Sequence, residues 1–84
     1  MDSATVSLLR LRVVADADPG AIARVVERFQ NLNFVPRRMI AEIGTDNRIH
    51  IQVDICGMRE AHLALIAQIV GQATNIIGAH WHRL

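Results

Sequence analysis

Two kinds of hydrophobic repeat alternate along the chain, and their order is the feature that most constrains its fold. Apolar residues recur at about every second position in four segments, near residues 6–14, 34–43, 48–56 and 75–83. They recur at helical spacing in two segments, near residues 19–32 and 59–70. Period-two spacing predicts half-buried strands, and a spacing of three and four residues predicts amphipathic helices. The predicted order is strand, helix, strand, strand, helix, strand.

The same patterns assign an inward face to each element. In the segment 48–56 the polar residues His50, Gln52 and Asp54 are expected to face outward. The residues expected to face the core are Leu9, Leu11, Val13, Ile22, Val25, Val26, Phe29, Leu32, Met39, Ala41, Ile43, Ile49, Ile51, Val53, Ile55, Leu63, Ile66, Ala67, Val70, Ile77, Ala79 and Trp81.

This order predicts an α+β fold of the ferredoxin-like βαββαβ type. Two helices cover one face of a four-stranded antiparallel sheet, and the other face stays polar or meets a partner. Right-handed crossovers place the first and third strands in the centre of the sheet. Pro36 cannot donate to a sheet ladder and therefore indicates an edge strand. With 84 residues, the chain is expected to form a single domain, 1–84.

Local signals mark several boundaries. Asp18 before Pro19 is suited to the N-cap and first position of a helix. The segment GTDN, residues 44–47, predicts a hairpin turn. Gly71 is expected to end the second helix.

Composition and charge exclude several function classes. A formal net charge of +1 argues against a protein that works by neutralising nucleic-acid phosphates. The exposed positions of the two central strands carry no aromatic residue that could stack on bases. No apolar run reaches the roughly 20 residues that span a bilayer. One cysteine and an N-terminus without a secretory signal indicate the cytoplasm.

No arrangement typical of a catalytic or metal site is found. His80 and His82 share one strand face, whereas His50 is expected two strands away, so we predict no metal. Cys56 is expected to be a small buried residue without a neighbouring base. An enzyme of the acylphosphatase type would need an arginine in a phosphate-binding loop after the first strand, where this chain has Asp16 and Asp18. We therefore predict no catalytic residue, no cofactor and no enzymatic activity.

The turn after the first strand is the candidate ligand site. A helix N-terminus attracts a carboxylate, and Asp16 or Asp18 could bind an ammonium group, so an amino-acid zwitterion would suit both. Gly20 would let the backbone approach closely. The alternative is that Asp18 only caps the helix.

The second strand is the candidate interface. As an edge strand it presents unpaired backbone groups, and pairing with a second copy would give a homodimer with an eight-stranded sheet. Pro36 and the charges of Arg37 and Arg38 could instead protect the edge.

The segments DPGAIARVVERF and NLNFVPRRM, with NRIHIQVDI and LIAQIVGQATNIIGAHWHRL, resemble the ACT domain family, most closely the short small subunit of acetolactate synthase. The resemblance covers residues 6–83. It implies a non-catalytic regulator of branched-chain amino-acid synthesis that binds a large thiamine-diphosphate-dependent subunit and senses an end product such as valine at a dimer interface. Carried over by position, the ligand residues are Asp16, Ala17, Asp18, Pro19, Gly20, Ala21, Phe34 and Val35.

Two positions depart from the family pattern. Amino-acid-binding relatives usually have asparagine at the positions of Ala17 and Val35. Each unmade hydrogen bond would weaken binding by about 1–3 kcal/mol. A free-standing amino-acid sensor that acts on another enzyme or regulator is the alternative function.

Overall fold

The computed structural model describes residues 8–84. Its elements are β1 (Leu8–Asp16), α1 (Pro19–Asn31), β2 (Arg38–Ile43), β3 (Arg48–Cys56), α2 (Glu60–Gly71) and β4 (Ile76–Arg83). The predicted order of elements is confirmed, and residues 6 and 7 of the predicted first strand lie outside the described range. No helix in residues 8–84 has the length and apolarity needed to cross a membrane.

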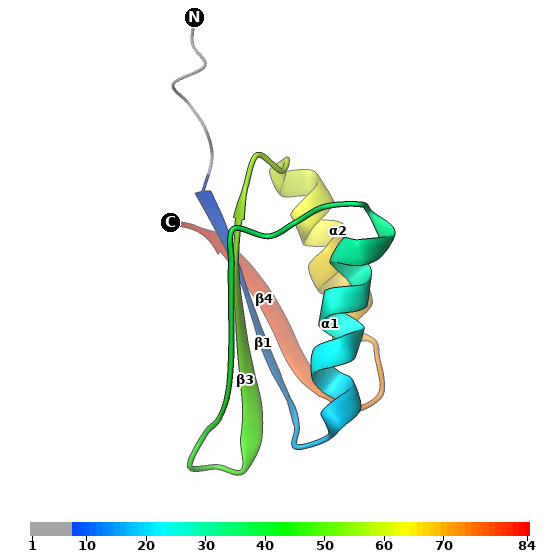
Figure 1. The fold of residues 1–84 in the computed structure, drawn as a ribbon, viewed down its shortest axis with the longest axis vertical. Coiled ribbons are helices and arrows are strands. Elements are labelled where there is room, and N and C mark those ends of the chain that lie inside the picture. The colour runs from blue at the N-terminus through cyan, green and yellow to red at the C-terminus, as the bar shows by residue number, and fades with distance from the viewer. Residues whose placement is uncertain (1–7) are drawn as a thin grey trace, which may run out of the picture.

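The four strands form one antiparallel sheet in the order β2-β3-β1-β4, with both helices on the same face (Figure 1). The predicted ferredoxin-like fold is confirmed, as are the central places of the first and third strands. β2 and β4 are the two edges. The opposite face of the sheet has no covering layer within residues 8–84.

The core lies between the two central strands and the helices. The alternating residues of β1 and β3 are buried as expected: Leu9, Leu11, Val13, Ile49, Ile51, Val53 and Ile55. The helices cover this face of the sheet and bury four of the larger core residues, Val25 and Phe29 from α1 and Leu63 and Ile66 from α2. Trp81 packs against this cluster, which confirms its predicted direction.

The prediction for β2 is wrong in its start and in part of its face. The strand begins at Arg38 rather than at residue 34. Asn33 has a left-handed backbone (φ 54°), which ends α1 and leaves residues 34–37 as a connection. Ala41 and Ile43 pair with core residues of β3, yet both are exposed, because α1 does not cover the outer edge of the sheet.

Part of the predicted inner face of α1 is also exposed. The buried residues are Ala21, Val25 and Phe29, whereas Ile22 and Val26 are 37% and 41% exposed. Leu32, also expected inside, is exposed at the C-terminal cap of the helix. The helix therefore turns an apolar flank toward solvent.

Three smaller predictions are corrected, one in β4, one at the end of α2 and one at Cys56. The pairing of β1 with β4 shifts register between Val14 and Ala15, so Ile76 packs on the core and Ile77 is exposed. Gly71 is the last residue of α2 rather than its stop, and the helix is capped at Gln72. Cys56 is half-buried rather than buried.

Candidate functional site

The turn between β1 and α1 is built around Asp18. This residue is the N-cap of α1, and its Oδ1 accepts a 3.2 Å hydrogen bond from the Gly20 N–H. Its carbonyl accepts a 2.9 Å bond from the Ala21 N–H. Pro19, at the first helical position, has no N–H. The predicted cap is confirmed.

The second carboxylate oxygen of Asp18 is bound from across the fold. Asn75, in the turn between α2 and β4, donates its side-chain amide to Asp18 Oδ2 at 2.5 Å. The Asn75 carbonyl accepts a 2.8 Å bond from the Asp16 N–H. Both oxygens of Asp18 are therefore engaged, and the two turns are joined by side-chain and backbone bonds.

These bonds use most of the polar groups of the predicted ligand corner. The first three positions of α1 offer no free donor, because Pro19 has none and the N–H groups of Gly20 and Ala21 already bind Asp18. The Asp16 side chain remains exposed to solvent. A ligand at this corner would meet Asp16 and the apolar Ala17 rather than a row of free N–H groups.

Phe34 and Val35 do not lie at that corner. They follow the C-terminus of α1, and the corner precedes its N-terminus, so the two sets lie at opposite ends of the helix (Figure 1). The helix has 13 residues, which at 1.5 Å per residue amounts to about 20 Å. One chain therefore does not bring the predicted ligand residues together.

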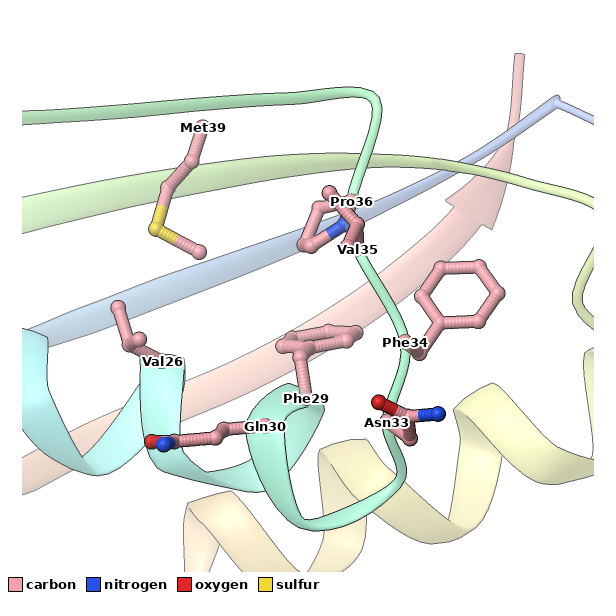
Figure 2. Close-up of a pocket in the computed structure, with 8 residues that line it drawn as sticks. All are labelled: Val26, Phe29, Gln30, Asn33, Phe34, Val35, Pro36 and Met39. Atoms are coloured by element: carbon pink, nitrogen blue, oxygen red, sulfur yellow. The ribbon is translucent and has the colours of Figure 1, made fainter.

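A groove of about 470 Å³ lies beside Phe34 and Val35, between α1 and the connection to β2. It is lined by Val26, Phe29, Gln30, Asn33, Phe34, Val35, Pro36 and Met39 (Figure 2). The rings of Phe29 and Phe34 have centroids 6.3 Å apart and form one wall. Among residues 8–84, no charged residue lines the groove, and its only polar side chains are the amides of Gln30 and Asn33.

The geometry of this groove depends on Asn33, which pattern analysis missed. The left-handed turn at Asn33 lets the Phe34 N–H return to the Phe29 carbonyl (2.9 Å). This turn places Phe34 beside Phe29. Asn75 also has a left-handed backbone conformation (φ 75°), and asparagine tolerates this conformation better than most residues do. An asparagine in the connection that follows a helix, two residues past α1 for Asn33 and four past α2 for Asn75, is the signal that could have located both turns.

The groove continues into an apolar border along the β2 edge. Val35 is 87%, Val26 41% and Ile43 60% exposed, and Val26, Val35 and Met39 also line the groove. We call Ile22, Val26, Val35, Met39, Ala41 and Ile43 the α1–β2 border. Contiguous exposed apolar residues commonly mark an interaction site.

The open face of the sheet carries charged residues instead. Arg10 forms two hydrogen bonds to Asp54, at 2.7 and 3.1 Å, and these lower the pKa of the Asp54 carboxyl although burial opposes the shift. Asp54 was expected to be exposed but is buried, because Arg10 covers it from the neighbouring strand. His50 pairs with Asp46 in the hairpin, which lowers the pKa of Asp46.

The histidines of the open face do not gather into a metal site. β1 separates His50 on β3 from His80 and His82 on β4. Within residues 8–84, no three His, Cys, Asp or Glu side chains lie close enough to hold a metal ion.

Comparison with known proteins identifies the fold. No protein-family model matches the sequence. No curated protein sequence matches it either. Solved structures do match over most of the chain.

The crystal structure of the ACT domain from GTP pyrophosphokinase of Chlorobium tepidum has a TM-score of 0.76 and 12% identity, and the match covers 93% of this chain and 100% of that one. The C-terminal domain of the MgtC protein from Mycobacterium tuberculosis has a TM-score of 0.75 and 16% identity, covering 100% and 94%. A homoserine dehydrogenase from Thiobacillus denitrificans matches with a TM-score of 0.73 and 16% identity over 96% of this chain and 18% of its own.

The chain therefore has the ferredoxin-like fold of the ACT type. At these identities the likeness concerns the fold.

Proposed function

We propose that this chain is a non-catalytic regulatory domain of the ACT type that works as a homodimer paired through the edge of β2. The observation that carries the proposal is the separation of the predicted ligand residues. Asp16–Ala21 and Phe34–Val35 lie at opposite ends of α1, and within residues 8–84 the edge of β2 has no partner strand.

Antiparallel pairing of two β2 strands would bring these sets together. Ile43, at the end of β2, pairs with Ile49, which also pairs with Ala15 next to the corner. The C-terminal end of β2 and the N-terminus of α1 therefore lie at the same end of the sheet, measured along the strands. A two-fold axis through the edge reverses the second copy, so its Val35 approaches the corner of the first.

The α1–β2 border supports the same arrangement. Ile22, Val26, Ala41 and Ile43 were predicted to be buried, are exposed in a single chain and belong to this border; Leu32 and Ile77 are also exposed but lie outside it. A second α1 laid over the joined β2 strands would remove them from water, at about 25 cal/mol per Å² of apolar surface buried. The errors at these four border positions are explained if their burial needs two copies.

The effector that suits this junction is an amino acid with an aliphatic side chain. The border is apolar, Ala17 and Val35 offer no side-chain donors, and the exposed carboxylate of Asp16 could bind the ammonium group. Valine, an end product of branched-chain synthesis, fits this description. The sequence resemblance extends the proposal to a small subunit of acetolactate synthase, with the large thiamine-diphosphate-dependent subunit as partner.

Two experiments test the function. Addition of the chain to a purified large subunit should change its activity and give a complex in size-exclusion chromatography, and an unchanged activity would contradict the subunit role. Calorimetry against a panel of amino acids should show saturable binding that Gly20→Val removes and Ala23→Val, at an exposed position of the same helix, leaves intact. Binding of valine without any effect on the large subunit would favour a free-standing sensor.

A further inference from the structure

The β2 edge presents only every second backbone unit to a partner. At the hairpin, the Gly44 N–H donates to the Arg48 carbonyl at 2.9 Å. Hydrogen-bonded pairs alternate along an antiparallel ladder, so Glu42 and Ile40 direct their N–H and C=O groups toward β3. Ala41 and Ile43 then direct theirs to the free edge, as does Met39.

The side chains follow the same alternation. Met39, Ala41 and Ile43 share the helix-covered face with their β3 partners, whereas Arg38, Ile40 and Glu42 lie on the open face. Opposed residues of an antiparallel pair share a face. If a two-fold axis keeps the helices of both copies on the same face of the joined sheet, one residue of β2 is directly opposite the same residue of the second copy. The axis passes between these two residues.

Four positions of the axis leave several residues of β2 paired, and their charges distinguish them. An axis at Glu42 opposes two carboxylates, and an axis at Met39 or Ala41 opposes charged residues to uncharged ones. An axis at Ile40 opposes Arg38 to Glu42 of the second copy twice. In residues 8–84 of a single chain, neither Arg38 nor Glu42 has an ion-pair partner.

We propose that two copies pair through β2 with Ile40 on the two-fold axis and with Arg38 of each copy opposite Glu42 of the other. This inference rests on the edge dimer proposed above. The pairs Ile40–Ile40 and Arg38–Glu42 are of the non-hydrogen-bonded kind, in which side chains approach closely. Met39 of each copy then opposes Ala41 of the other on the helix side, a large residue against a small one.

Cysteine cross-linking tests this register in a Cys56→Ser background. Ile40→Cys places two Cα atoms about 4.5 Å apart, within the range of a disulfide. Ala41→Cys in the same register leaves its copies offset by two residues, about 8 Å or more apart, outside that range. Ile40→Cys should oxidise to a covalent dimer at least about tenfold faster than Ala41→Cys. His80→Cys, on the opposite edge, is the negative control.

The outcomes separate the register from the dimer. Preferential cross-linking of Ala41→Cys would overturn the register and leave the β2 dimer in place. No cross-link at either position, with circular dichroism of a folded chain, would overturn the register, because an axis at Met39 or Glu42 brings neither pair of cysteines within disulfide range. A folded chain that sediments as a monomer would contradict the edge dimer itself.

A charge exchange gives an independent readout. Arg38→Glu or Glu42→Arg should raise the dimer dissociation constant about 5- to 30-fold, because two cross-strand pairs become repulsive. The double variant should recover most of that loss, and Arg59→Glu, which makes the same charge change before α2, should have little effect. Single variants that dimerise normally, or a double variant that stays as weak as either single one, would overturn the register.

Discussion

Asn75 donates its side-chain amide to the Asp18 carboxylate at 2.5 Å, joining two turns that are 57 residues apart in the chain. Because the other oxygen of Asp18 caps α1, one carboxylate fixes the start of the helix against the turn before β4. The corner that resembles a ligand site is thus also a structural junction.

The first prediction concerns this junction. Asp18→Ala should lower the free energy of unfolding by about 0.5–2 kcal/mol, because the Gly20 N–H and the Asn75 amide both lose their acceptor. Asn75→Gly keeps the left-handed backbone and removes only the amide, so its loss should be smaller. Urea unfolding measures both, and an Asp18→Ala chain as stable as the native one would contradict the assignment.

The second prediction concerns pH. The hydrogen bonds from Arg10, and more weakly the charges of Arg38 and Arg37, hold the pKa of Asp54 below its ordinary value. The stabilisation is therefore present above the ordinary carboxyl pKa of about 3.9 and is lost as pH falls through the lowered folded value. Melting temperatures recorded between pH 6 and pH 3 should fall less steeply for Asp54→Asn than for the native chain.

An exposed pair provides the comparison for that measurement. Asp46 is also held below its ordinary pKa, mainly by its hydrogen bond to His50, but the pair lies at the surface of the hairpin. Asp46→Asn should change the acid slope less than Asp54→Asn does. A larger effect from Asp46 would mean that burial beneath Arg10 is not what makes Asp54 important.

The third prediction compares two glycines. Gly57 has φ +86°, which side chains rarely adopt, so Gly57→Ala should destabilise the fold by about 1–2 kcal/mol. Gly71 is helical, and a Cβ there would meet the Cβ of Ala79 at an ordinary 3.7 Å. Gly71→Ala should stabilise the fold by up to about 1 kcal/mol. Equal effects at the two positions would contradict this account of the backbone.

Alternation alone was enough to predict the sheet and its buried centre. The alternate residues Ile49, Ile51, Val53 and Ile55 lie in the core as expected. β3 is a central strand, so the helix-covered face of every one of these positions is buried. The cap at Asp18 was also predictable, because its signal is local.

The remaining features depend on contacts distant in sequence. Asp54 looks solvent-exposed by alternation and is buried by Arg10 from another strand. Ile77 follows the alternation, but a register shift between β1 and β4, which leaves Ile77 unpaired, directs Ile76 inward instead. The separation of Val35 from the corner, by contrast, follows from the sequence, because a helix of 13 residues stands between them.

The fourth prediction isolates the edge. Ala41 directs its N–H outward, so Ala41→Pro should remove pairing with a second copy and leave the ladder to β3 intact. Ile40 directs its N–H toward β3, so Ile40→Pro should unfold the chain. Circular dichroism and thermal melting distinguish the two variants, and an unfolded Ala41→Pro would contradict the backbone directions assigned to β2.

The solution mass of the chain tests the central claim most directly. Sedimentation equilibrium at micromolar concentration should give twice the 9.3 kDa mass of one chain for the native protein. The folded Ala41→Pro variant should sediment with the mass of one chain. A native chain that sediments as a monomer across that concentration range, or an Ala41→Pro chain that remains a dimer, would contradict pairing through β2.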